Sequence, residues 1–528
     1  MTSKRAWPRR FVGFLVALVV GVALGSLVQT QFNLVALRDL GVEIPVSLWL
    51  QTSLFDLLSF TPLYTVVFGV SFLVSQLLAG LVAGRLSADW RPWVHALAAA
   101  VGLWVTLRVV NHLVPMPTLI AATRSWGGLL AMLWAAGVSG WLFARLTPMM
   151  AKPASMSSVA ALALLLLAPV FTPGGQLQAE EGRDYQVATW AGDLEHPWSL
   201  AFLPDGGALV TERAGRLWRF DAQGERVGGA LTGVPAVFAS GQAGLFEVLL
   251  APDFADSGLL YLSYACGTLR ANHACISRAR LTAAGLEQVE EIFRTRPAKR
   301  GDAHYGGRMV WLADGTLVLS LGDGFDYREQ AQNLANHWGT IVRLNSDGSV
   351  PRDNPFSMSP EAVPEIYSYG HRNVQGLVYD SANDRLIAHE HGPRGGDEIN
   401  LILPGKNYGW PVVTHGLDYT GARITPFTER PNMQPPLLHW TPSIAPSGMT
   451  LYDGELFPHW QGDLLVGALA ARRVHRVSLD HSSAQDVEVL FAELGERIRD
   501  VRTGPDGAVY LLTDSPQGRV LRVTPVQH

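Results

Sequence analysis

The residue types best suited to acid–base chemistry gather in short polar segments in the last two thirds of the chain. One segment reads GDAHYGGRMVW and contains His304 and Arg308, and the nearby LGDG segment contributes Asp323. An imidazole paired with a carboxylate can take a proton from a substrate hydroxyl. A single histidine is more often structural, so its meaning depends on the other polar segments.

A second group of residues is typical of an anion site. Gln242 lies in ASGQAGLFEV, and Arg372 and Asn373 lie in YSYGHRNVQGLVYD. Arg497 and Arg499 follow in GERIRDV. Several arginines directed at one place repel each other unless a polyanion lies between them. Together these segments predict an anionic cofactor, whereas separately such residues would only brace loops.

A third segment, HEHGPRGGDEINLILPGKNYGWP, combines acidic side chains with turns rich in glycine. It holds Glu390, Asp397, Glu398 and Tyr408. Carboxylate and carbonyl oxygens suit Ca²⁺; a tight turn without metal is the alternative. The sequence has no zinc pattern of Cys and His, and its glycine clusters lack the strand-to-helix setting of a dinucleotide site.

The elements that must position these residues are predicted by a repeat. From Asp184 onward, a turn containing Asp or Gly is followed by a short apolar strand in six places, beginning near Leu203, Ala251, Leu312, Tyr379, His459 and Gly504. Their spacing is at or somewhat above the blade period of propellers. Six radial sheets leave only short edges around a central channel, whereas a β-sandwich fits six similar units poorly. We therefore expect a six-bladed β-propeller over residues 184–528.

The first third of the chain has the composition of membrane helices. Four stretches reach the ~20 apolar residues that a span needs, and a fifth is shorter: Phe11–Val28, Leu63–Val82, Val94–Leu113, Trp126–Leu146 and Ser157–Phe171. The last resembles the core of a signal peptide, but we interpret it as an anchor because four spans precede it; cleavage near Ala179 stays open. The predicted domains are a five-span membrane domain (1–172), a linker (173–183) and the propeller.

Positive charges predict the orientation, because cytoplasmic loops retain Lys and Arg. Eight such residues lie on one side of the five spans and two on the other: Lys4, Arg5, Arg9, Arg10, Arg85, Arg91, Arg145 and Lys152 against Arg38 and Arg124. The propeller is therefore expected in the periplasm of an inner-membrane protein. Arg108 and His112, near the outer end of the third span, either reach the interface or serve a quinone.

Composition excludes one class of partner. The net charge of −5 offers no basic surface for nucleic acid. Cys266 and Cys275 close a short loop; outside the cytoplasm we expect a disulfide, and inside it free thiols.

The ordered segments resemble a known family. HPWSLAFLPDGGALVTERAGRL, GQAGL, HYGGRMV, LGDG, GHRNVQGL, EHGPRGGDEINLI and GKNYGWP follow one another as in the glucose/sorbosone dehydrogenases, specifically the soluble aldose sugar dehydrogenases. The similarity covers Asp184 to Pro525 and not the membrane third. It implies an enzyme that oxidises an aldose at its anomeric carbon with pyrroloquinoline quinone (PQQ) and Ca²⁺.

The resemblance also implies roles for individual residues. His304 would be the catalytic base, Asp323 would orient it, and Arg372 would stabilise charge on the quinone oxygen. The implied PQQ-binding residues are Gln242, Arg372, Asn373, Tyr419, Arg497 and Arg499. The carbonyls of Gly392 and Pro393 would bind the catalytic Ca²⁺, Glu398 and Tyr408 would bind a second Ca²⁺, and Trp440 would line the substrate mouth.

One position departs from the family pattern. Where relatives often carry a lysine, this chain has Ala470 in VGALAARRV, and Arg472 or Arg473 could supply the charge. Two other functions are weighed against the dehydrogenase. A Ca²⁺-dependent lactonase would need a central cage of acidic side chains, which an arginine-rich channel disfavours, and a non-catalytic propeller on a membrane tether would not need His304. The sugar and the acceptor, ubiquinone or another, are not specified.

Overall fold

The computed structural model describes residues 6–113, 118–147 and 184–526. The chain forms two compact units. The first contains the described residues before 148 together with Leu417–Pro426, and the second contains the other described residues after 183. We describe each unit by itself.

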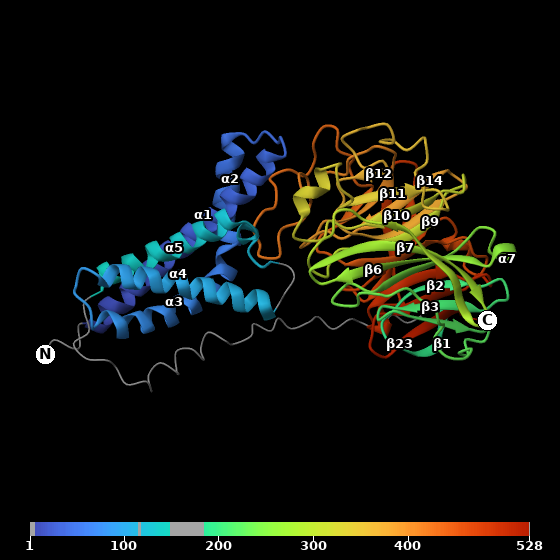
Figure 1. The fold of residues 1–528 in the computed structure, drawn as a ribbon, viewed down its shortest axis with the longest axis horizontal. Helices are drawn as coiled ribbons and strands as arrows, with labels where there is room; N and C mark the ends of the chain where they lie inside the picture. The colour runs from blue at the N-terminus through green and yellow to red at the C-terminus, as the bar shows by residue number, and fades with distance from the viewer. Residues whose placement is uncertain (1–5, 114–117, 148–183, 527–528) are drawn as a thin grey trace. The chain divides into compact units, whose positions relative to one another are not determined.

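Long apolar helices form the first unit (Figure 1). They are α1 (Ala6–Asp39), α2 (Val46–Ser59), α3 (Thr61–Ala83), α4 (Arg91–Leu113) and α5 (Trp126–Leu146), with the short η1 (Ala121–Arg124). Among the described residues, α1, α3, α4 and α5 are long and apolar enough to cross a membrane, whereas α2 is not. They match the first four predicted spans. The fifth predicted span, Ser157–Phe171, lies outside the described residues, and α2 was not predicted.

Six small antiparallel sheets form the second unit within the described residues. The first sheet contains β2 (Pro197–Phe202), β3 (Ala208–Glu212) and β4 (Arg216–Phe220), and the second contains β5 (Leu245–Leu250), β6 (Leu259–Thr268), β7 (Ala271–Thr282) and β8 (Gly285–Arg294). The third contains β9 (Gly306–Trp311), β10 (Leu317–Leu321), β11 (Thr340–Leu344) and β12 (Ile366–Tyr369), and the fourth contains β13 (Val374–Asp380), β14 (Arg385–Glu390), β15 (Asp397–Ile402) and β16 (Leu438–Trp440). The fifth contains β17 (Pro446–Leu451), β18 (Leu464–Ala468), β19 (Arg473–Leu479) and β20 (Ala484–Leu490). Short helices α7 (Phe254–Ser257), η3 (Arg328–Gln332), η4 (Pro458–Trp460) and η5 (Ala492–Leu494) lie in the connections. The predicted six-bladed propeller is confirmed.

The sixth sheet closes the ring with strands from both ends of the unit. β21 (Ile498–Thr503), β22 (Val509–Thr513) and β23 (Gly518–Pro525) are joined by β1 (Tyr185–Leu194), which pairs antiparallel with β23. The first and last strands of the propeller are therefore held by one ladder of hydrogen bonds.

The repeated turns have the same place in every blade. Each joins the first strand to the second, as at Leu203 between β2 and β3 or at Gly504 between β21 and β22. The second strands β3, β10, β18 and β22 are buried along their whole length. Apolar cores fill the space between neighbouring blades, as where Phe246 of β5 and Leu319 of β10 belong to one cluster. Cys266 and Cys275 form a disulfide across the β6–β7 hairpin, as predicted for a location outside the cytoplasm.

Candidate active site

The candidate site residues meet because of where they lie in each blade. His304, Asn373 and Arg497 precede the first strands β9, β13 and β21, while Asp323 and Gly392 follow the second strands β10 and β14. In an antiparallel pair, the start of one strand and the end of the next lie at the same edge. Segments about 190 residues apart, those of His304 and Arg497, are thus brought to one end of the propeller.

His304 and Asp323 form a buried pair. The His304 Nδ1 and Asp323 Oδ1 atoms are 2.7 Å apart, and 3% of His304 is exposed. Burial alone would raise the pKa of Asp323, but His304 and Arg372 outweigh it and hold that pKa below its ordinary value. Because an ionised carboxylate only accepts hydrogen bonds, the proton of the neutral ring lies on Nδ1 and Nε2 keeps its lone pair. Burial, and next the charge of Arg372, lower the pKa of His304 to about 4, so the ring is neutral at physiological pH.

The backbone at His304 is fixed in an uncommon conformation. Its φ of +54° lies in the left-handed region, which a residue with a side chain rarely adopts. Its N–H donates to Gln242 Oε1 at 2.9 Å. The buried ammonium of Lys299 donates to the carbonyl oxygen of Ala303, the preceding residue, at 2.9 Å. Lys299 is a supporting residue that the sequence did not single out.

A cavity of about 250 Å³ is lined by Tyr305 and Gly306, which follow His304 in the chain, and by Gln242, which accepts from the His304 N–H; His304 and Asp323 are not among its lining residues. Four residues predicted to bind PQQ line it: Gln242, Asn373, Arg497 and Arg499. Arg372 and Tyr419 are not among its lining residues. Tyr419 is 48% exposed and lies in the segment Leu417–Pro426, which belongs to the first unit.

The cavity also contains residues that sequence reasoning missed. Asp514 Oδ2 accepts from Arg497 Nη2 and Arg499 Nη2, each at 3.0 Å, and its Oδ1 lies 2.9 Å from His196 Nδ1. Burial opposes ionisation of Asp514, but these arginines keep its pKa below the ordinary value. Arg213 lines the cavity as well, so the arginines outnumber this carboxylate and the cavity favours an anion.

Neither arginine near Ala470 supplies a positive charge to the cavity. Arg472 and Arg473, which could have replaced a missing lysine, bind the carbonyls of Gly495 and Ala471 and do not line the cavity. Arg213, which follows the last residue of β3, is a further cation in the lining. The TERAGRL segment was the signal for it.

Arg372 contacts the turn predicted to bind Ca²⁺. Its Nη1 donates to the carbonyl oxygens of His391, at 3.1 Å, and Gly392, at 2.8 Å. That turn is held by Asp397, whose Oδ1 accepts from Gly392 N and whose Oδ2 accepts from Ser443 Oγ. Each carbonyl oxygen has two lone pairs, so the Gly392 carbonyl that binds Arg372 can accept a second cationic partner.

The second predicted metal site has different neighbours from those expected. Burial and the nearby carboxylate of Glu390 raise the pKa of Glu398 to about 8. Asn400 Nδ2 lies within 3.4 Å of both carboxylates, and its buried Oδ1 lacks a hydrogen-bond partner among the described residues. The Tyr408 hydroxyl instead donates to the carbonyl of Leu401. Two carboxylates, Glu390 and Glu398, and the unpartnered Oδ1 of Asn400 therefore lie together at β14–β15, although Glu390 already accepts from His371 Nδ1 and Arg372 N.

Trp440 lies in the packing between strands. It is 8% exposed, belongs to an apolar core cluster and donates to Asp486 Oδ2 at 2.8 Å. It is not among the residues that line the cavity. Its predicted place at the substrate mouth stays a prediction.

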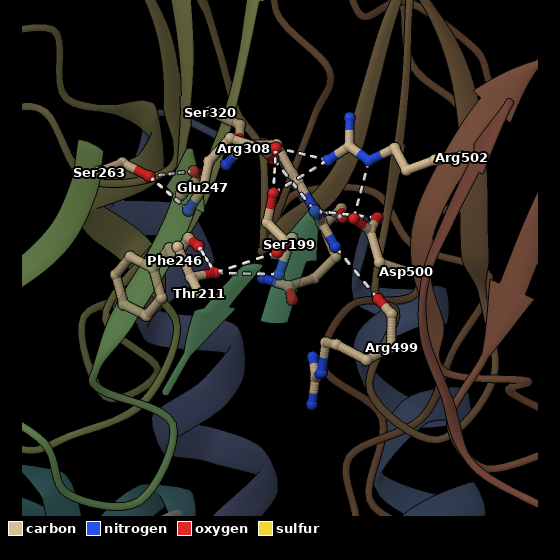
Figure 2. A network of polar contacts seen from close by, with 12 residues as sticks. Ser199, Thr211, Phe246, Glu247, Ser263, Arg308, Ser320, Arg499, Asp500 and Arg502 are labelled. Carbon is tan, nitrogen blue, oxygen red and sulfur yellow. Dashed lines mark hydrogen bonds and ion pairs between the residues drawn. The ribbon is translucent and has the colours of Figure 1, made fainter. Parts of the chain in front are cut away.

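A buried ion-pair network centres on Arg308 (Figure 2). Arg308 Nη1 lies 3.0 Å from both Glu247 Oε2 and Asp500 Oδ1, and its guanidinium stacks on Trp198, 3.9 Å from the ring centroid. Arg502 pairs with the same two carboxylates. Figure 2 shows Arg308 between Glu247 and Asp500.

Arg308 also reaches the remaining blades. Its Nε donates to the carbonyl of Gln375 at 3.0 Å, and its Nη2 donates to that of Arg499 at 3.1 Å. Gly448 leaves room for it, since a Cβ there would lie 2.8 Å from Nη2. The first strands of all six blades, β2, β5, β9, β13, β17 and β21, thus provide Arg308 or a contact to it. Arg308 thus contacts three residues that line the cavity: Trp198, Gln375 and Arg499.

Comparison with known proteins agrees with this geometry. Residues 194–522 match the family model described as Glucose / Sorbosone dehydrogenase. Aldose sugar dehydrogenase YliI of Escherichia coli (strain K12) is 41% identical over 338 residues, which cover 63% of this chain and 91% of that protein. Quinoprotein glucose dehydrogenase B of Acinetobacter calcoaceticus is 28% identical over 455 residues, covering 70% and 93%.

Solved structures agree as well. The PQQ-bound form of an aldose sugar dehydrogenase from Streptomyces coelicolor is 29% identical, covers 64% of this chain and 98% of its own, and superimposes with a TM-score of 0.54. Since the family model matches more than half of the chain and the site residues lie at one end of a six-bladed propeller, this chain belongs to the glucose/sorbosone dehydrogenase family of sugar-oxidising enzymes.

Proposed function

We propose that this protein oxidises aldose sugars at the anomeric carbon to the lactone, with PQQ in the central cavity and Ca²⁺ beside it. The observation that carries the proposal is the buried His304–Asp323 pair next to a cavity lined by Gln242, Asn373 and arginines. Within this family a quinoprotein glucose dehydrogenase and a PQQ-bound relative support the cofactor.

The residues present fit PQQ and Ca²⁺. PQQ carries carboxylates, and Arg213, Arg497 and Arg499 line the cavity with only Asp514 to balance them. Ca²⁺ binds carbonyl oxygens, and the Gly392–Pro393 turn is held rigidly by Asp397. Glu390, Glu398 and Asn400 would hold a second Ca²⁺, which would also relieve the repulsion between the two carboxylates. Tyr408 and Tyr419 keep their predicted roles as proposals.

The chain's own groups then divide the chemistry among them. His304 Nε2 accepts the proton of the C1 hydroxyl, and Asp323 stabilises the resulting imidazolium through Nδ1. Arg372, anchored on the Gly392 carbonyl, stabilises negative charge that develops beside it. PQQ, when bound, supplies the quinone that accepts the hydride leaving C1.

We also propose where this reaction takes place. The predicted division into a membrane domain (1–172), a linker (173–183) and a dehydrogenase domain (184–528), together with the charge bias across the spans, supports an inner-membrane protein whose catalytic domain faces the periplasm. Electrons would pass to ubiquinone or another respiratory acceptor.

The proposal is tested with purified protein, PQQ and Ca²⁺. Sugar-dependent dye reduction should appear only when both are added, and His304→Gln should lower turnover by about 10² to 10⁴ while PQQ still binds. Removal of Ca²⁺ by a chelator should abolish activity and its return should restore it. Full activity in calcium-free protein, or a His304→Gln variant with normal turnover, would contradict the corresponding assignment.

A further inference from the structure

Trp410 contacts the Asp323 carboxylate of the catalytic pair. It lies in the loop after β15, is 6% exposed, and its indole Nε1 donates to Asp323 Oδ2 at 2.8 Å. The other carboxylate oxygen, Oδ1, accepts from His304 Nδ1 and from Phe325 N, each at 2.7 Å. Trp410 is therefore the donor that orients the Asp323 oxygen which His304 does not use.

The face of the same indole ring lies near Arg372. The guanidinium carbon is 5.3 Å from the Trp410 ring centroid and 5.6 Å from that of Phe325, within the range of cation–π attraction. The Phe325 ring in turn lies 4.4 Å from the His304 ring. One indole thus contacts both the acid–base pair and the arginine that stabilises charge.

The backbone of Trp410 is held independently of Asp323. Its N–H donates to the carbonyl of Gly370, and its own carbonyl accepts from Gln332 Nε2, both at 2.8 Å. The indole is therefore anchored by the loop, and the carboxylate is the group whose orientation depends on the contact.

We propose that Trp410 is a positioning residue whose indole N–H orients Asp323 toward His304 and whose ring holds Arg372 beside them. This inference rests on the proposed function, in which His304 is the base. Without the N–H, the Asp323 carboxylate keeps more of its charge for His304 and stabilises the imidazolium more strongly. His304 should then lose its proton only at a higher pH.

Two substitutions separate the N–H from the ring. Trp410→Phe keeps an aromatic face and removes the donor, whereas in Trp410→His the imidazole overlays the five-membered ring of indole and its Nε2–H can replace the lost donor. Trp311→Phe is the matched control, because Trp311 Nε1 donates to the Leu250 carbonyl at 2.8 Å and lies at the end of β9 opposite to His304.

We expect Trp410→Phe to lower kcat about 10-fold, since a hydrogen bond to a charged group is lost. KM should change less than about 2-fold, and the acid limb of kcat/KM should move up by about half a pH unit. Trp410→His should bring the limb back, and Trp311→Phe should match the wild type. In protein without PQQ, the histidine NMR signal that disappears in His304→Gln should titrate at higher pH in Trp410→Phe.

Each result decides between alternatives. If Trp410→Phe and Trp410→His lower kcat equally with the acid limb and the NMR titration unmoved, Trp410 only packs the site and the positioning role is refuted while the function stands. The same holds if Trp410→Phe behaves as wild type but His304→Gln is inactive. If His304→Gln is fully active, the proposed function fails first, and the role of Trp410 fails with it. If Trp410→Phe does not fold, Trp410→His decides: a kcat and an acid limb near those of the wild type support the N–H donor, and a lowered kcat with an unmoved limb refutes the positioning role.

Discussion

At the scale of single residues, His304 combines two properties that a general base requires. Burial and Arg372 keep its ring neutral, and Asp323 fixes which nitrogen carries the proton. A base that is neutral at rest can accept a proton at Nε2 without first losing one.

This protonation state predicts a pH dependence. The pKa of His304 is lowered to about 4, so protonation that blocks the base occurs only as the pH falls through about 4. We expect kcat/KM for the sugar to hold between pH 7 and 5 and to fall below about 4. Circular dichroism at each pH separates this loss from unfolding. A limb near the ordinary histidine value of 6.5 would show that the ring is solvated and unlike the buried group described above.

The arginines of the cavity predict a second effect, on cofactor affinity. Arg497 lines the cavity, whereas Arg472 does not and is exposed. Arg497→Met should weaken PQQ binding about 10- to 100-fold, the cost of losing a hydrogen bond between charged groups, and Arg472→Met should leave it unchanged. Equilibrium titration of PQQ followed by absorbance measures both. Equal affinities of the two variants would remove Arg497 from the PQQ site.

At the scale of elements, the first strands of the blades depend on one buried arginine. Arg308 and Asp500 are 3% and 1% exposed at the side chain, and breaking a buried ion pair from one side leaves an uncompensated charge. The same arginine contacts Trp198, Gln375 and Arg499, which line the cavity, so stability and site geometry are linked there.

Arg308→Met should therefore destabilise the propeller by about 3–5 kcal/mol. Arg278→Met is the control, because Arg278 pairs with Glu290 at the surface, where an ion pair is worth about 1 kcal/mol or less. Urea denaturation followed by tryptophan fluorescence measures both. If the two variants lose similar stability, Arg308 is not the centre that holds the blades.

At the scale of the whole molecule, this chain has a helical unit in addition to the propeller that it shares with its relatives. The relatives from Escherichia coli and Streptomyces coelicolor are matched over 91% and 98% of their own length by 63% and 64% of this chain. The apolar helices are thus a feature beyond the shared dehydrogenase, and one span would be enough for an anchor.

The charge bias predicts the side of the membrane. A reporter that works only outside the cytoplasm, fused after His528, should be active if the Lys- and Arg-rich loops between the spans stay in the cytoplasm, as the positive-inside rule predicts. Full-length protein should also reduce a ubiquinone analogue with sugar, while residues 184–528 alone should need a dye. Activity of a cytoplasmic reporter would reverse the topology, and equal quinone reduction by both forms would leave the helices as an anchor only.

The sequence by itself determined the features that depend on local chemistry. Turns of Asp and Gly followed by apolar strands specified the second strand of every blade, and the length of the apolar runs specified four of the helices, because each pattern acts within about 20 residues. The motifs around His304 and Asp323 were sufficient to predict the pair and the family.

Only the tertiary structure decided which distant groups face each other. Asp514 meets His196 across 318 positions of the sequence, Arg213 reaches the cavity, and Trp440 turns into a core. The fit of Trp410 against Asp323 spans 87 positions. Such contacts form only when the six blades close into a ring, which the pairing of β1 with β23 completes. A local sequence pattern does not specify which loops then face each other.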